Sequence, residues 1–290
     1  MDGFSEQEFF VEVDTGVRLM VRAKIPSAER LGLAALLVHG SGVGWVYWDI
    51  PIRNYSIMDY LAGRGIDVYA VECRGYGKSN KLNGMIITTS IMARDMKHVC
   101  EAVMRQSEVK RVSMVGHSSG GTVVLLAASM YPGLVDCMVV IGTPYKKISP
   151  QFMEYVRMVA EMSKEPGRDY VPNLHYRDIE ERLDTCEDDV LAWYKATVEK
   201  HYGVIPGGLF PDLASSPAVA SVPGIKAPTL ILIGSNEYVL ELDDALAMYK
   251  DLGSADKSII MLPGAYHLMF LEKSGHGRLQ ESLFFWITKK

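Results

Sequence analysis

Apolar and polar residues alternate in two stretches near the N-terminus, residues 9–13 and 17–23. A period of two is the pattern of a strand with one buried face. The stretches are separated by Asp14, Thr15 and Gly16, and a short connection that contains glycine joins antiparallel strands in a hairpin. We therefore predict a β-hairpin in this part of the chain.

Short apolar runs replace the alternation further along the chain. They lie at residues 33–38, 67–71, 112–115, 137–141, 229–233 and 258–262. Runs of this kind are typical of strands that are buried on both faces of a parallel sheet. The segments between them carry apolar residues at helical spacing. This spacing predicts helices at residues 55–62, 88–105, 122–130, 243–252 and 277–287.

Strands that alternate with helices form right-handed βαβ units around a parallel sheet, so the expected fold class is α/β. The alternation lapses between residues 145 and 222. No strand is predicted there, and the predicted helices are residues 151–162, 176–183 and 188–201. We expect a core domain of residues 1–144 and 223–290, and a helical cap of residues 145–222 that covers the open end of the sheet.

The run at residues 112–115 leads into the pentapeptide Gly-His-Ser-Ser-Gly at residues 116–120, and an apolar helix pattern follows. This pattern predicts a strand, a very tight turn and a helix, with Ser118 at the apex. Glycine is needed at both ends of the turn because a side chain there would collide where strand and helix approach each other. The turn lifts the Ser118 hydroxyl out of the sheet, beside the positive end of a helix. The alternative interpretation of Ser118 is a plain turn residue.

Two residues that could activate Ser118 also follow predicted strands, Glu237 and His267. Ligands bind at the carboxyl ends of the strands of an open parallel sheet, so we expect all three side chains at one edge. A serine needs a neighbouring base, a histidine can take the proton and return it, and a carboxylate orients the histidine. We predict a catalytic triad of Ser118, His267 and Glu237. Asp243 and Asp244 are alternatives for the acid, although capping the first turn of a helix explains them better.

The order serine, acid, histidine is the order found in α/β-hydrolases. Further motifs in family order are His39-Gly40, the Arg-Gly-Tyr-Gly-Lys-Ser segment at residues 74–79, the pentapeptide at residues 116–120 and the late His267. Over essentially its whole length, the chain resembles an α/β-hydrolase-fold serine hydrolase. The resemblance implies a mostly parallel eight-stranded sheet flanked by helices, with a helical cap inserted after the strand at residues 137–141.

The resemblance also implies an oxyanion hole formed by the backbone N–H groups of Ser41 and Ser119. Gly40 and Gly42 flank Ser41 and would leave access for a substrate carbonyl, so we expect both to contact substrate. One oxyanion donor typically contributes about 2.7–4 kcal/mol to transition-state stabilisation. The aromatic candidates for the pocket lining, each of which could equally pack between cap and core, are Trp45, Tyr47, Trp48, Tyr145, Phe152, Tyr155 and Trp193.

Within the family, the His-Gly-Ser-Gly-Val-Gly loop at residues 39–44 resembles the His-Gly-Ser-Gly-Pro-Gly loop of meta-cleavage-product hydrolases, which cut carbon–carbon bonds. The likeness is partial. Val43 replaces the proline, the serine motif is not the Gly-Asn-Ser-Met-Gly common there, and no tryptophan follows His267. We therefore keep carbon–carbon bond cleavage as the second choice.

Composition limits the partners and the cofactors. The chain has 290 residues, 48% of them hydrophobic, and a net charge of −5 without a basic block. This charge argues against nucleic acid or an anionic membrane as a partner, and no apolar leader or run of roughly 20 residues is present. None of the four cysteines is paired at C-x-x-C spacing, so we expect free thiols in a reducing cytoplasm. Neither metal-ligand spacing nor a phosphate-binding lysine motif occurs, so no metal and no cofactor is expected.

Together these features predict a cytoplasmic, cofactor-free serine hydrolase. Its expected substrate is an ester or lactone of a moderately apolar small molecule, and the expected intermediate is an acyl-enzyme. Three alternatives remain open: a carbon–carbon bond hydrolase, an acyltransferase, and a ligand receptor with little turnover on the same fold. A homodimer is also left open.

Overall fold

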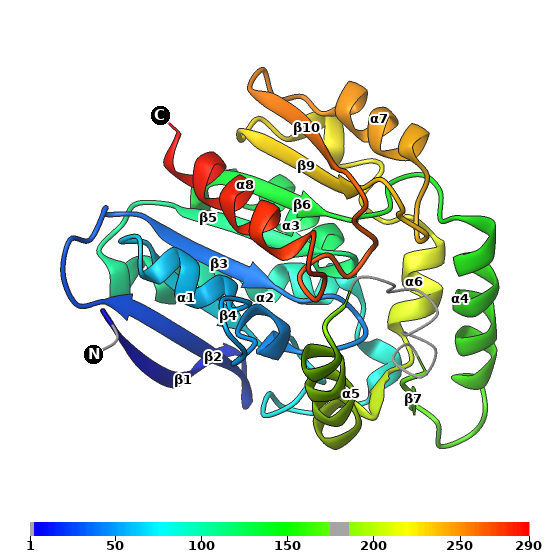
Figure 1. The fold of residues 1–290 in the computed structure, drawn as a ribbon. Coiled ribbons are helices and arrows are strands. Elements are labelled where there is room, and N and C mark those ends of the chain that lie inside the picture. Colours follow the sequence, from blue (N-terminus) through cyan, green and yellow to red (C-terminus); the bar gives the residue numbers. More distant parts are fainter. Residues whose placement is uncertain (1–2, 175–185, 290) are drawn as a thin grey trace.

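The protein is described by a computed structural model that covers residues 3–174 and 186–289. Its main feature is an eight-stranded sheet with the strand order β1-β2-β4-β3-β5-β6-β9-β10 (Figure 1). The strands of this sheet are β1 (Phe4–Asp14), β2 (Val17–Pro26), β3 (Ala34–Val38), β4 (Asp67–Val71), β5 (Val112–His117), β6 (Val135–Ile141), β9 (Thr229–Gly234) and β10 (Lys257–Leu262).

Most neighbouring strands are parallel, and this confirms the predicted fold class. Only β1 with β2 and β2 with β4 pair antiparallel in this sheet, and every pair from β4 to β10 is parallel. The N-terminal hairpin is confirmed, but β1 begins at Phe4, earlier than predicted. Residues 5–8 are exposed and polar, so they carry no alternation, and backbone pairing with β2 extends the strand.

Helices cover both faces of the sheet. The helices α1 (Ile57–Ala62) and α8 (His276–Thr288) pack together on one face, and α2 (Thr89–Ser107) and α3 (Ser119–Met130) pack on the other (Figure 1). The helix α7 (Leu242–Asp251) lies against β9 and β10. Short 3-10 turns are η1 (Trp45–Trp48), η2 (Gly84–Ile86), η3 (Pro132–Leu134) and η5 (Val222–Gly224).

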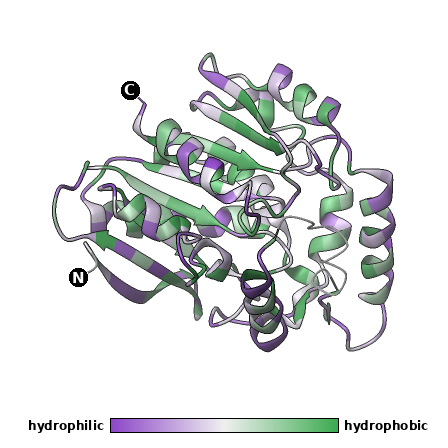
Figure 2. Cartoon of the chain, in the orientation of Figure 1, coloured by the Kyte–Doolittle hydropathy of each residue, from purple (hydrophilic) through white to green (hydrophobic). Residues whose placement is uncertain are grey.

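The central strands are apolar because both of their faces are covered. Every residue of β3, β4, β5 and β9 is buried. Figure 2 shows these central strands mostly in the hydrophobic colour, whereas the edge strand β1 has hydrophilic stretches. The carboxyl ends of the parallel strands therefore project from a rigid core, and the loops that follow them are fixed in position.

The segment between β6 and β9, called the insertion below, lies outside the eight-stranded sheet (Figure 1). It contains α4 (Pro150–Met162), α5 (Asp188–Tyr202) and the short α6 (Leu209–Ala214). The prediction of no strand here was wrong: β7 (Tyr170–Pro172) and β8 (Val204–Pro206) form an antiparallel pair. Strands of three residues are too short to show a period. The helix predicted at residues 176–183 lies outside the described residues, and the division into core and cap stays a prediction.

Candidate active site

Ser118 lies at a sharp turn between β5 and α3. Its φ of 55° and ψ of −124° fall in a region that non-glycine residues rarely adopt. A hydrogen bond from the Ser118 N–H to the carbonyl of Ile141, at 2.8 Å, holds the strained residue in place. A Cβ added to Gly116 would lie 2.4 Å from the Gly120 carbonyl oxygen, and one on Gly120 would lie 2.4 Å from the carbonyl oxygens of residues 38 and 39. The predicted reason for both glycines is thereby confirmed.

His267 and Glu237 meet at the same edge of the sheet, after β10 and β9. The His267 Nδ1 atom lies 2.9 Å from Oε1 of Glu237, and both side chains are 2% exposed. The same carboxylate oxygen accepts the backbone N–H groups of Tyr238 and Val239, each at 2.9 Å. A carboxylate with three donors on one oxygen is fixed in orientation. This is the arrangement that selects the His267 tautomer with a proton on Nδ1.

The two alternative acids are engaged elsewhere. Asp244 accepts the backbone N–H groups of Tyr145, Lys146 and Lys147. Asp243 is exposed, with its nearest cationic partner, Lys147, 3.9 Å away. Glu237 is thus the one of the three candidates that has a hydrogen bond to His267 within the described residues.

Ser118 and His267 line the same narrow cavity. The part that the described residues enclose has a volume of about 10 Å³, close to the space needed by one water molecule. Its lining consists of Gly40, Ser41, Gly42, Val43, Tyr47, His117, Ser118, Tyr194, His267 and Leu268. The three loops that the sequence singled out at the ends of β3, β5 and β10 therefore meet around one small space.

Two backbone N–H groups have no acceptor among the described residues: that of Ser41, which lines this cavity, and that of Ser119, which directly follows Ser118. Ser119 is the first residue of α3, where the N–H has no partner inside the helix and the helix dipole adds positive potential. A buried N–H group ordinarily finds a partner. Two unsatisfied donors near Ser118 can therefore donate hydrogen bonds to a developing oxyanion.

His39 braces the loop that carries Ser41. Its Nδ1–H donates to the Gly40 carbonyl at 2.7 Å, and its Nε2 accepts the N–H of Cys73 at 2.9 Å. Complete burial lowers the pKa of His39 to about 4, so the ring is neutral near pH 7. The Tyr76 hydroxyl donates to the Ser41 carbonyl at 3.0 Å.

Tyr47 and His117 connect this loop to the base. The Tyr47 hydroxyl accepts the Gly40 N–H at 2.7 Å and lies 3.3 Å from His117 Nδ1. His117 Nε2 lies 3.0 Å from the carbonyl oxygen of His267. Because a carbonyl only accepts, His117 carries its proton on Nε2, and Nδ1 accepts from Tyr47. The elbow histidine thus positions the backbone of His267.

Of the aromatic candidates, Tyr47 lines this cavity, and the other six are not among the described residues that line it. Trp45 packs under the guanidinium of Arg22, whose carbon is 5.5 Å from the ring centroid. The Tyr145 hydroxyl donates to Asp251 at 3.0 Å. Phe152 is buried on α4. None of these three is among the described residues that line the Ser118 cavity, whereas Gly40 and Gly42 are.

The sequence analysis missed Tyr194, which reaches the cavity from α5. A signal was present. The buried residues of α5 are Val190, Tyr194, Val198 and Tyr202, one every four positions. This spacing identifies the inward face of the helix.

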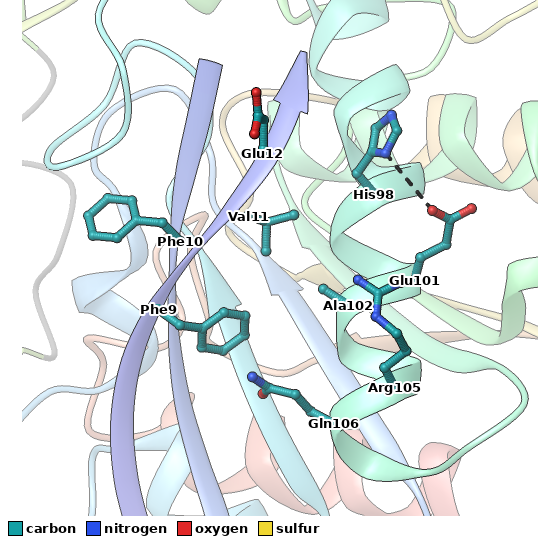
Figure 3. A pocket seen from close by; sticks show the side chains of 9 residues that line it. All are labelled: Phe9, Phe10, Val11, Glu12, His98, Glu101, Ala102, Arg105 and Gln106. Carbon is teal, nitrogen blue, oxygen red and sulfur yellow. Dashed lines mark ion pairs between the residues drawn. The ribbon is translucent and has the colours of Figure 1, made fainter. Parts of the chain in front are cut away.

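A wider groove of about 470 Å³ lies between β1 and α2, away from Ser118 (Figure 3). His98 and Glu101 lie on its α2 side, with His98 Nδ1 3.9 Å from Glu101 Oε2, and Phe9, Phe10 and Val11 line it from β1. The groove contains no member of the triad. No group of three or more potential metal ligands occurs in the described ranges. None of the helices described there is long and apolar enough to cross a membrane.

Comparison with known proteins identifies the family of the chain. Residues 52–274 match the family described as serine aminopeptidase, S33. A monoacylglycerol lipase of Mycolicibacterium smegmatis is 23% identical over 264 residues, 89% of this chain and 88% of that protein. A 2-hydroxy-6-oxononadienedioate/2-hydroxy-6-oxononatrienedioate hydrolase of Paraburkholderia phymatum is 26% identical over 233 residues, 76% of each.

Solved structures show the same fold. An esterase from Thermogutta terrifontis superposes with a TM-score of 0.73 at 20% identity, covering 97% of this chain and 98% of that one. A soluble variant of monoglyceride lipase from Saccharomyces cerevisiae superposes with a TM-score of 0.76 at 16% identity, covering 98% and 95%. The chain therefore belongs to the serine aminopeptidase S33 family and is a serine hydrolase with the α/β-hydrolase fold.

Proposed function

We propose that this hydrolase cleaves carboxylic esters, lactones included, of moderately apolar small molecules through a triad of Ser118, His267 and Glu237. The hydrogen bond between His267 and Glu237, at the cavity that Ser118 lines, is the observation that carries the proposal. A serine, a base and an orienting acid in this relation are the requirements of acyl transfer.

The proposed reaction has two steps. His267 takes the hydroxyl proton as Ser118 Oγ attacks the ester carbonyl, and the N–H groups of Ser41 and Ser119 bind the oxyanion. The tetrahedral intermediate collapses to an acyl-enzyme, and His267 returns the proton to the leaving alcohol. Water, activated by the same histidine, then attacks the acyl-enzyme and releases the acid.

The described lining of the cavity supports an uncharged reacting group beside Ser118. Among the described residues that line it, none is an aspartate, glutamate, lysine or arginine. An aminopeptidase needs an anionic group for the α-ammonium of its substrate, and a dicarboxylate substrate needs cationic groups. An uncharged ester needs neither. The monoacylglycerol lipase relatives further support an ester with an apolar acyl chain.

Carbon–carbon bond cleavage is the second candidate function. It is supported by the relatives that act on 2-hydroxy-6-oxononadienedioate and by the loop at residues 39–44. The same serine, histidine and acid would carry it. A dianionic substrate of this kind fits the uncharged lining less well than a neutral ester does.

The test combines labelling with turnover. Wild type and Ser118→Ala are treated with a fluorophosphonate, and the adduct is measured by intact mass. Turnover is then measured on p-nitrophenyl esters of increasing chain length, a monoacylglycerol, a lactone, an aminoacyl anilide and a 2-hydroxy-6-oxo-dienoate. We expect labelling of wild type alone and fastest hydrolysis of a neutral ester.

Other outcomes have distinct meanings. Labelling without ester turnover would favour an acyltransferase, a carbon–carbon hydrolase or a receptor. Wild type that remains unlabelled, or Ser118→Ala with substantial activity, would contradict the assignment of the nucleophile. The cytoplasmic location and the homodimer stay predictions.

A further inference from the structure

Asn173 joins the insertion to the loop at residues 39–44, called the oxyanion loop below. Asn173 follows β7 and is 1% exposed. Its side-chain Nδ2 donates to the Gly42 carbonyl at 2.5 Å and to the Tyr202 carbonyl at 2.9 Å. Its backbone N–H donates to the carbonyl of Gly203 at 2.9 Å. A primary amide has two N–H donors. One donates to the Gly42 carbonyl in the oxyanion loop, and the other donates to the Tyr202 carbonyl in the insertion.

A second contact fixes the other end of the oxyanion loop. The Tyr202 hydroxyl, at the end of α5, donates to Glu72 Oε1 at 2.6 Å, and Glu72 Oε2 accepts the Lys78 N–H at 2.8 Å. A Cβ on Gly44 would lie 2.2 Å from Glu72 Oε1 and 2.5 Å from the Tyr202 ring. Gly44 therefore packs directly on this buried pair.

The oxyanion loop needs such contacts because it contains three glycines, Gly40, Gly42 and Gly44. Glycine loses more conformational freedom on ordering than any other residue. Three successive carbonyls of the loop are held by side chains: Gly40 by His39, Ser41 by Tyr76, and Gly42 by Asn173. The first two donors belong to the core, and the third belongs to the insertion.

The geometry of the peptide unit connects these carbonyls to catalysis. In a planar trans peptide the C=O of one residue points opposite to the N–H of the next. The bond to the Gly40 carbonyl therefore sets the direction of the Ser41 N–H, and the bond from Asn173 prevents rotation of the loop on the far side of Ser41. A donor whose N–H···O angle falls below about 120° loses much of its effect on an oxyanion.

We infer that Asn173 is a positioning residue for the oxyanion hole. Through Asn173, the orientation of the Ser41 N–H depends on how the insertion packs against the core. This inference rests on the proposed function, in which the Ser41 N–H binds the oxyanion. Tyr202 helps to hold the oxyanion loop in place through its hydrogen bond to Glu72. Neither Asn173 nor Tyr202 is among the described residues that line the cavity, so both act through the loop.

The test uses Asn173→Ala with an ester that wild type hydrolyses. We expect kcat to fall about tenfold or more, with KM within twofold, because only transition-state stabilisation is reduced. The affinity for a trifluoromethyl ketone, which forms a tetrahedral adduct with serine, should fall by the same factor. The affinity for an unreactive amide analogue of the substrate should stay unchanged. Asn83→Ala, which removes an exposed asparagine side chain that accepts a backbone N–H, is the matched control and should behave as wild type.

A second variant keeps the inference testable if Asn173→Ala does not fold. Tyr202→Phe removes one hydroxyl and keeps the ring, and we expect a smaller loss with the same split between kcat and KM. A rise in KM with unchanged kcat in a folded variant, or equal weakening of both inhibitors, would overturn the inference. Absence of labelling and turnover in wild type would instead overturn the proposed function, whatever Asn173 does.

Discussion

The imidazole Nδ1 of His267 lies 2.9 Å from Oε1 of Glu237, in surroundings where each side chain is 2% exposed. Water competes weakly for a hydrogen bond at this depth, so the bond is strong and its direction is fixed. With the proton on Nδ1, Nε2 of His267 is the nitrogen left to accept a proton, and in the proposed mechanism that proton comes from Ser118. In the proposed triad a glutamate is the acid, a position for which both aspartate and glutamate are known in this fold.

Glu237→Gln tests the acid. The amide can present its N–H to His267, which selects the wrong tautomer, so we expect kcat to fall by about three to four orders of magnitude. Steady-state kinetics on a p-nitrophenyl ester measures the loss. Asp243→Asn, at an exposed site, is the control and should leave kcat within twofold of wild type. A large loss in Asp243→Asn and a small one in Glu237→Gln would mean that the acid is misassigned.

Gly116→Ala tests the packing of the elbow. Its Cβ would lie 2.4 Å from a backbone oxygen, and backbone cannot move aside as a flexible side chain does. We expect a loss of about 3 kcal/mol or more in the free energy of unfolding, measured by urea denaturation. Gly133→Ala is the control, because nothing lies within 4 Å of its added Cβ. Equal stability of the two variants would show that the elbow tolerates a side chain.

His39 predicts a pH dependence of stability. Burial lowers its pKa from 6.5 to about 4, so between these values the unfolded chain binds more protons than the folded one. Stability is therefore complete above about pH 6.5 and falls as the pH drops towards 4, by up to about 3 kcal/mol. Denaturation at a series of pH values measures the slope for wild type and for His39→Gln. The slope of the unfolding free energy against pH in this window should be smaller in His39→Gln than in wild type. Identical slopes would exclude His39 as the cause. The control is His98→Gln, at an exposed site, which should keep the wild-type slope.

Tyr47→Phe tests the connection between the oxyanion loop and the elbow. It removes the acceptor of the Gly40 N–H and the donor to His117. A buried N–H without a partner costs about 1–3 kcal/mol, so we expect lower stability together with a lower kcat. Thermal unfolding and ester kinetics on the same preparation measure both. Tyr131→Phe is the control variant. A Tyr47→Phe protein with unchanged stability and kcat would contradict the role of the Tyr47 hydroxyl.

The sheet and the elbow could be predicted from the sequence because they depend on local patterns. Apolar runs mark β3, β4 and β9, which are buried on both faces. The three triad candidates could be named for a related reason. Parallel strands bring their carboxyl ends to one edge, so a residue that follows a strand has a predictable place.

The rest depends on contacts between distant parts of the chain. The strands β7 and β8 have three residues each and are separated by α5, so neither has a pattern of its own. Asn173 looks like any loop asparagine until its bond to Gly42 is seen. The direction of a side chain also cannot be read from the sequence. Tyr145 is buried as a pocket residue would be, but its hydroxyl reaches Asp251 rather than the cavity.

The contacts of His117 also have a consequence for folding. Its ring meets Tyr47, 70 residues earlier, and the backbone of His267, 150 residues later. Contacts across such separations form late, because closing a long loop has an entropic cost that local helices do not bear. A chain with its helices formed but these segments undocked would have the proposed nucleophile, Ser118, without the proposed base, His267. Recovery of activity in a refolding experiment should therefore follow recovery of helical signal, and enzymatic turnover becomes a reporter of the last docking step.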